Sequence, residues 1–180
     1  MRKVFIAWCL IVLASFMVQA QEDAKPADVA KDDWVKFTSD TGRFSVMLPA
    51  TPSENIEKGP TLNGPPVTHT FSVKTPGGTI FMIAWVDKGA GSTFNPKREL
   101  EASRDKFAQT LQAMIVNSRQ TTIDGFQALE FTAETQAFNI KSRVLIVGRR
   151  PYQIVFASPR GLDAAADLDR FFESFTVREQ

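Results

Sequence analysis

The chain has 180 residues, of which 43% are hydrophobic, and its 21 Lys and Arg nearly balance its 20 Asp and Glu. This balance argues against a nucleic-acid-binding protein, which normally carries a strongly basic face. Zinc is bound mainly by Cys and His side chains, and the chain has one of each, Cys9 and His69. Neither a Walker loop nor a G-x-G-x-x-G motif occurs. We therefore predict neither a metal site nor a cofactor.

Residues 1–20 have the plan of a secretory signal peptide. A basic start, Arg2-Lys3, precedes an apolar run over 4–18, and Val18-Gln19-Ala20 offers small residues for cleavage. The apolar run has about 15 residues, fewer than the roughly 20 that a spanning helix needs. We therefore expect export, cleavage near Ala20 and a periplasmic or secreted protein. An uncleaved membrane anchor is the alternative.

A polar leader separates this signal from one predicted domain. Residues 21–33 lack hydrophobic periodicity, so we expect a flexible segment there. The domain is predicted over 34–178, and a mature chain of about 160 residues buries roughly 70% of its unfolded surface. Loss of Arg2 and Lys3 with the signal lowers the 21 basic residues to 19, against 20 acidic, for a net charge of −1. Cysteine is lost too, so the core must supply the stability.

The domain is predicted to open with short strands over 34–38 and 44–48. Pro49 ends the second strand, because proline cannot donate to a strand ladder. A short edge strand is expected at 53–58, inside a proline-rich segment. Pro49 and Pro52 are interpreted as a corner of the fold, with a ligand-binding loop as the alternative.

Three β-hairpins follow in the prediction. Asp124-Gly125 is among the strongest hairpin signals, because a type I′ turn needs positive φ at both central residues. Residues 79–86 are apolar on both faces, which predicts a central strand covered on both sides. The predicted strand pairs are 68–74 with 79–86, 119–123 with 126–132, and 138–147 with 152–157.

Two helices are predicted among the strands. Asn95 can cap the first helix and Pro96 suits its first position. A second helix is expected to start near Asp163 as its N-cap, and 175–177 would form a last strand. The fold class is therefore α+β, a largely antiparallel sheet with two helices packed on it. Helical spacing gives apolar faces to Leu100, Phe107, Leu111, Met114 and Ile115, and to Leu168, Phe171 and Phe172.

Both ends of the domain resemble the PsbP-like family, here an exported bacterial domain. "FSVMLPATP" matches an aromatic-rich strand ending in Leu-Pro-x-x-Pro, and "RFFESFTV" matches a closing helix with Phe-x-x-Ser-Phe. The resemblance covers about 34–178. It implies an α/β/α sandwich and an exported, usually non-enzymatic accessory role; plant members assist photosystem II and yeast relatives bind a small GTPase. No functional residue is carried over. The matching residues are Phe44, Val46, Leu48, Pro49, Pro52, Phe171, Phe172, Ser174 and Phe175.

Catalytic patterns are weak in this sequence. His69 would have to carry the proton in a Ser-His-Asp triad, but no G-x-S-x-G elbow occurs, so His69 is interpreted as a core or rim residue. Ser103 and Lys106 match S-x-x-K without its partner motifs. The acidic residues from Asp163 to Glu173 lack the spacing of a calcium loop. We therefore predict that the protein is not an enzyme.

Basic residues cluster late in the chain, where 135–162 hold no acidic residue. One interpretation is an exposed strand protected by positive charge against edge pairing. The other is a site for an anionic partner: lipid head groups, a polyanionic envelope polymer or an acidic protein face. The candidate partner-binding residues are Lys141, Arg143, Arg149 and Arg150, with Arg160 nearby in sequence.

Together these patterns predict an exported, non-enzymatic accessory or binding domain of the cell envelope. We expect a monomer with no membrane span in the mature chain, and an unknown protein or anionic envelope component as its partner. One alternative is a hydrolase with two carboxylates brought together, one of them with a raised pKa. The other is a sensor of anionic lipid or polymer that acts through the basic hairpin.

Overall fold

The computed structural model describes residues 34–59, 66–87 and 95–178. The predicted signal peptide and leader lie outside these residues. In the part of the chain that is described, no helix is long and apolar enough to cross a membrane.

The described strands form two antiparallel sheets. The smaller has the order β1-β2-β10, with β1 at Val35–Ser39, β2 at Phe44–Leu48 and β10 at Thr176–Val177. The larger has seven strands in the order β3-β4-β5-β9-β8-β7-β6. Their bounds are β3 Ser53–Lys58, β4 Val67–Lys74, β5 Ile80–Asp87, β6 Met114–Ile123, β7 Phe126–Glu134, β8 Phe138–Val147 and β9 Arg150–Pro159.

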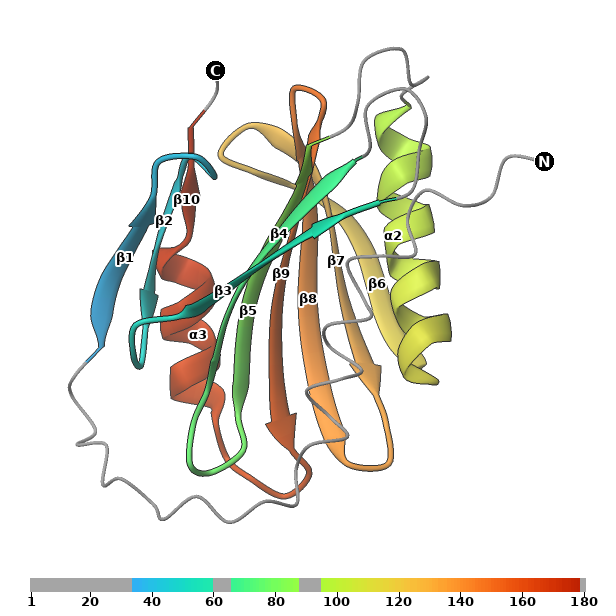
Figure 1. Cartoon of the computed structure of the whole chain (residues 1–180). Coiled ribbons are helices and arrows are strands. Elements are labelled where there is room, and N and C mark those ends of the chain that lie inside the picture. The colour runs from blue at the N-terminus through green and yellow to red at the C-terminus, as the bar shows by residue number, and fades with distance from the viewer. Residues whose placement is uncertain (1–33, 60–65, 88–94, 179–180) are drawn as a thin grey trace.

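Helices cover both faces of the seven-stranded sheet (Figure 1). Helix α2, Pro96–Leu111, packs on one face, and helix α3, Ala165–Ser174, lies on the other together with the small sheet. Asn95 caps α2 as predicted, since its side chain accepts a hydrogen bond from the Arg98 N–H at 3.1 Å. The predicted α+β class is confirmed.

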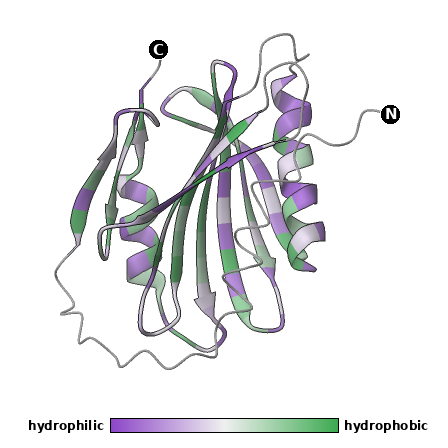
Figure 2. Cartoon of the chain, in the orientation of Figure 1, coloured by the Kyte–Doolittle hydropathy of each residue, from purple (hydrophilic) through white to green (hydrophobic). Residues whose placement is uncertain are grey.

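Two apolar cores fill the spaces between these layers. The core on the α3 face is rich in aromatic rings and joins β2 and α3 to strands β4, β5 and β9. Phe81 lies at its centre, with its ring centroid 5.1 Å from that of Phe156 and 5.2 Å from that of Phe171. On the α2 face, Leu100 and Phe107 pack against β5, β7, β8 and β9. Figure 2 shows hydrophobic residues running along the inner strands, as expected for a sheet covered on both faces.

The first helix is shorter than predicted. Gln112 takes a left-handed conformation, with φ 51°, and ends α2 at Leu111, so Met114 and Ile115 begin strand β6. Their assignment to the helix was wrong. Ile115 packs against the core under α2 from the strand instead, while Met114 is 64% exposed. The three- and four-residue spacing therefore joined apolar residues from two elements.

Two further predictions concern the start of α3 and the connection between β2 and β3. Helix α3 has Ala164, not Asp163, as its N-cap residue, although the Asp163 carboxylate accepts a hydrogen bond from the Ala165 N–H at 3.3 Å. The segment from Pro49 to Pro52 joins β2 of the small sheet to β3 of the large one. The two prolines therefore lie at a corner between sheets, as interpreted from the sequence.

Candidate partner-binding face

A nearly buried carboxylate on the α3 face of the large sheet is surrounded by three cations. Glu130 is 8% exposed. Its Oε2 accepts a hydrogen bond from Arg143 Nε at 2.6 Å, and its Oε1 accepts from Arg119 Nη2 at 2.8 Å. The Lys141 ammonium lies 4.0 Å from Oε1. Three positive charges therefore share one negative charge.

The strand register places these side chains together. Glu130 on β7 is directly opposite Arg119 on β6 and Arg143 on β8. Lys141 precedes Arg143 by two positions on β8, so both side chains lie on the same face of the strand. Directly opposite pairs have their Cβ atoms about 5 Å apart, close enough for charged side chains to interact.

Burial alone would raise the pKa of Glu130, because it penalises the charged form. Hydrogen bonds from Arg143 and Arg119, with the charges of Arg143 and Lys141, outweigh burial and lower that pKa below its ordinary value of 4.5. Glu130 is therefore a permanent anion at neutral pH.

Helix α3 contacts the same cations. Arg143 Nη1 donates to the Phe172 carbonyl at 3.1 Å, and its guanidinium lies 4.5 Å from the centre of the Phe172 ring. The Lys141 ammonium lies 5.5 Å from that ring centre. Arg143 thus ties α3 to the sheet, whereas Lys141 makes no hydrogen bond within the described residues.

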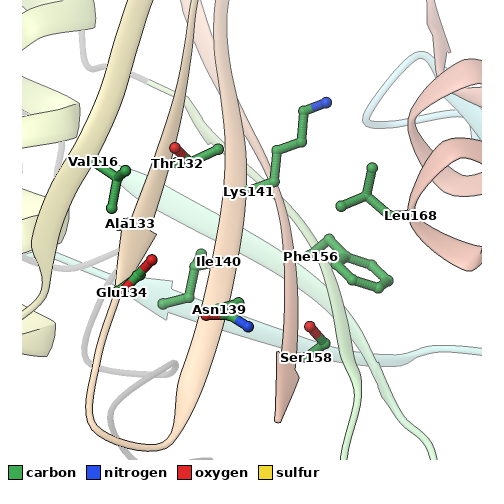
Figure 3. A pocket seen from close by; sticks show the side chains of 10 residues that line it. All are labelled: Val116, Thr132, Ala133, Glu134, Asn139, Ile140, Lys141, Phe156, Ser158 and Leu168. Atoms are coloured by element: carbon green, nitrogen blue, oxygen red, sulfur yellow. The ribbon is translucent and has the colours of Figure 1, made fainter. Parts of the chain in front are cut away.

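A groove of about 200 Å³ opens beside Lys141 (Figure 3). Val116 of β6, Phe156 of β9 and Leu168 of α3 give it apolar walls. Figure 3 shows Leu168 extending from the helix toward the strands. Thr132, Glu134 and Lys141 supply polar groups around it. The arrangement suits an apolar group that lies next to a charged one.

The structure separates the four predicted site residues into two pairs. Lys141 and Arg143 lie on the sheet face, while Arg149 and Arg150 lie at the β8–β9 turn. Arg150 lies opposite Val147, four positions along β8 from Arg143, which is roughly 13 Å at about 3.3 Å per residue, and Lys141 is two positions further away. Strand β8 lies between β7 and β9, so the interpretation of its charges as protection of an edge strand was wrong.

Arg150 serves the fold at the turn. Its Nη2 lies 2.6 Å from Asp87 Oδ1, and its Nη1 donates to the Thr41 carbonyl at 2.8 Å. Burial alone would lower the pKa of Arg150, but the contacts with Tyr152 and Asp87 raise it, so the guanidinium stays charged. Arg160 pairs with Glu134 and donates a hydrogen bond to the Thr135 carbonyl at 2.9 Å. It follows the last residue of β9, whereas Arg150 is the first residue of that strand, so the two arginines lie far apart.

His69 lies at the rim of the α3-face core. Its imidazole stacks on the Trp85 ring at 4.6 Å, and its side chain is 16% exposed. Glu54 and Asp87 carboxylates lie 3.6 and 4.0 Å from its two ring nitrogens. No group of three or more metal-binding side chains occurs among the described residues.

Lys106 of the S-x-x-K pattern donates a hydrogen bond to Gln109 at 3.4 Å on the exposed side of α2.

Sequence reasoning missed Arg119 and Glu130. The signal was present in the Asp124-Gly125 turn, whose residues have φ of 51° and 82°. A two-residue turn fixes the register of its hairpin, so residues equally far from the turn lie opposite each other. Arg119 and Glu130 are such a pair.

No family model and no curated protein matches the chain. Among solved structures, the solution structure of cyanobacterial PsbP from Synechocystis sp. PCC 6803 is similar, with a TM-score of 0.56 and 9% sequence identity. The likeness covers 86% of this chain and 98% of that one. This chain has a PsbP-like fold. A crystal structure from Bacteroides thetaiotaomicron VPI-5482 has a TM-score of 0.44 at 15% identity, covers 81% of this chain and 48% of its own, and adds nothing to this assignment.

The resemblance read from the two ends of the sequence is therefore confirmed at the level of the fold. Phe44, Val46 and Leu48 are buried on β2, and Phe171, Phe172 and Phe175 are buried against the same core. Ser174 joins these PsbP-like ends directly, since its Oγ accepts a hydrogen bond from the Met47 N–H at 2.9 Å.

Proposed function

We propose that this PsbP-like chain is an exported, non-catalytic binding domain of the cell envelope that recognises an acidic protein partner. The observation that carries the proposal is the cluster of Arg119, Lys141 and Arg143 around the single carboxylate of Glu130. We name this surface the basic face. Export rests on the signal-peptide plan of residues 1–20.

Charge counting supports an anionic partner. The basic face has three cations and one anion, so it carries a local excess of two positive charges. Both Glu130 oxygens accept hydrogen bonds from guanidinium groups, and the Lys141 ammonium has no hydrogen-bond acceptor among the described residues, so its donors suit an anionic partner. Complementary charge raises the rate of encounter and selects the partner more than it raises the affinity.

The hydrolase alternative receives less support. A carboxylate pair for acid–base chemistry needs one carboxyl that is protonated at working pH. Glu130 has a lowered pKa, and the nearby Glu134 is paired with Arg160. Neither group suits the role of general acid.

The basic-hairpin alternative also receives less support. Asp87 neutralises Arg150, and the Thr41 carbonyl holds the same guanidinium in place. Exchange of Arg150 would therefore disturb the fold as well as any binding. The basic face offers Lys141, whose ammonium is not committed to the fold in this way.

The purified chain, expressed with its own signal, tests the proposal with three probes. Poly-L-glutamate represents an acidic protein surface, phosphatidylglycerol vesicles represent lipid, and an anionic polysaccharide represents an envelope polymer. We expect binding to poly-L-glutamate that weakens with salt. Lys141→Glu should weaken it about fivefold, since one exposed ion pair contributes up to ~1 kcal/mol.

Lys74→Glu is the matched control, because Lys74 is an exposed lysine at the end of β4, outside the basic face. Its effect should be much smaller than that of Lys141→Glu. Equal effects of the two variants, or binding to vesicles alone, would contradict the proposal. Amino-terminal sequencing of the protein from the periplasmic or secreted fraction tests export, and a chain that starts at Gln21 is expected.

A further inference from the structure

The geometry points to strand β6 as the docking strand for the partner. We infer that an extended segment of an acidic partner protein pairs with the outer edge of β6. An apolar side chain of that segment would lie against Val116 at the groove, and an acidic side chain two residues away would meet Arg119. The inference rests on the proposed binding role and names the chemistry of the segment that is bound.

The two edges of the large sheet differ in their protection against pairing. Strand β3 has six residues, and Glu54, Glu57 and Lys58 give it three charges. Strand β6 has ten residues, of which Arg119 is the charged one. Natural proteins keep edge strands from pairing with short length, charge and β-bulges. Edge β3 is short and charged, whereas β6 is long and nearly uncharged, with one bulge near its start.

The groove begins at this edge, where no other described strand pairs with the outer side of β6. Val116 is the extra residue of a β-bulge between Ile115 and Asn117, and it lines the groove. Its side chain is aliphatic yet 54% exposed. A strand added to a sheet edge gains affinity from main-chain hydrogen bonds and specificity from pockets for alternate side chains. Here the edge and the pocket are continuous.

The spacing of the bound segment follows from the pleat. Asn117 and Arg119 lie opposite Thr132 and Glu130, on the face that holds the groove. Side chains on one face of a strand recur every two residues. A paired segment therefore places one residue opposite Asn117, next to the bulge residue Val116, and another, two positions away, opposite Arg119. Charge complementarity with the basic face makes that second residue Asp or Glu.

The first experiment uses nine-residue threonine-rich peptides, titrated into isotopically labelled protein and followed by NMR. One peptide carries Leu and Glu two positions apart, and its control carries them three positions apart, which sends them to opposite faces. We expect the first peptide to bind at least about fivefold more tightly, since the control forfeits either the apolar or the ionic contact. Shifted amides should lie in β6 and around the groove. Equal affinities, or shifts that avoid β6, would overturn the inference.

N-methylation of alternate peptide amides tests the main-chain pairing itself. In a strand, alternate N–H groups point to the same side, so one set of methyl groups should abolish binding and the other set should be tolerated. If both sets are tolerated or both abolish binding, β6 pairing is excluded.

A matched pair of protein variants tests the anchor. Val116→Gln should weaken the peptide about tenfold, because it replaces the apolar contact at the groove. Ile56→Gln is the control, since Ile56 is 51% exposed on the opposite edge strand, β3. Equal losses would refute the anchor. If the peptide binds but poly-L-glutamate does not, the proposal that the partner presents an acidic surface is rejected. The inference that β6 is the docking strand is then kept.

Discussion

At the scale of single residues, Glu130 connects stability with the basic face. Its carboxylate is nearly buried and receives hydrogen bonds from two guanidinium groups on neighbouring strands. A buried ion with several partners is costly to disrupt, because removing one partner leaves the others desolvated and unpaired. Glu130 therefore holds Arg119 and Arg143 in place and thereby defines the shape of the surface around Lys141.

We predict that Glu130→Gln lowers the free energy of unfolding at neutral pH by about 1.5–3 kcal/mol, the contribution of hydrogen bonds to a charged group. The folded-state pKa of Glu130 is below 4.5, so its carboxylate contributes full stability above that value and loses it as the pH falls through the folded pKa. The penalty should therefore be larger at pH 7 than at about pH 4, where the carboxylate begins to be protonated. Urea unfolding at both pH values measures it.

Glu134→Gln provides the comparison, because Glu134 lies on the same strand with a side chain 37% exposed and one ion pair, to Arg160. Its effect at pH 7 should be smaller than that of Glu130→Gln, as is typical of exposed pairs. A penalty for Glu130→Gln that is the same at both pH values would show that the loss comes from packing and not from charge.

At the scale of elements, the β1–β2 turn is wedged against the large sheet. The Gly42 carbonyl accepts a hydrogen bond from the Tyr152 hydroxyl at 2.9 Å, and its N–H donates to Ser39 Oγ at 3.0 Å. A Cβ on Gly42 would lie 2.8 Å from the Trp85 ring. Close approach, not backbone conformation, therefore requires glycine at this position.

We predict that Gly42→Ala lowers the free energy of unfolding by about 1–3 kcal/mol, the usual cost of forcing extra volume into a packed site. Gly77→Ala is the control, because the nearest atom to a Cβ there lies 3.9 Å away. That variant should be neutral or stabilise slightly by restricting the unfolded chain. Thermal unfolding compares the two. Similar melting temperatures for both variants would show that the turn can move away from Trp85.

At the scale of the whole molecule, the end of the chain completes the core. Phe171, Phe172 and Phe175 are each 6% exposed or less, and β10 pairs with β2 near the start of the domain. The Arg178 N–H donates to the Arg43 carbonyl at 3.0 Å. The beginning and the end of the domain are thus packed into one layer.

We predict that a chain truncated after Arg170 does not fold cooperatively. It lacks Phe171, Phe172, Phe175 and Val177, and burial of each contributes about 1.5–3 kcal/mol, so the loss is comparable to the whole net stability of a domain. Circular dichroism and urea titration should show no sigmoidal transition, whereas removal of residues 179–180 should leave one. A cooperative transition in the longer truncation would show that the α3-face core is dispensable.

The sequence predicted most elements because their signals are local. Two-residue alternation marks the strands, Asp124-Gly125 marks a hairpin, and Asn95-Pro96 marks the start of α2. The same reasoning failed at Met114 and Ile115, because apolar spacing continues across the left-handed Gln112 into the next strand. A one-residue change of backbone conformation leaves no trace in a hydrophobic pattern.

For the candidate site, the sequence determined that Lys141 and Arg143 share a strand face, because alternation is a property of a single strand. It also contained the pairing of Arg119 with Glu130, through a short turn of fixed register. The tertiary structure alone decided that β9 lies between β5 and β8, that β6 is an edge, and that Phe172 and Leu168 of α3 approach the cations. Those contacts join segments distant in the chain, and their selection depends on how whole layers bury their apolar faces against one another.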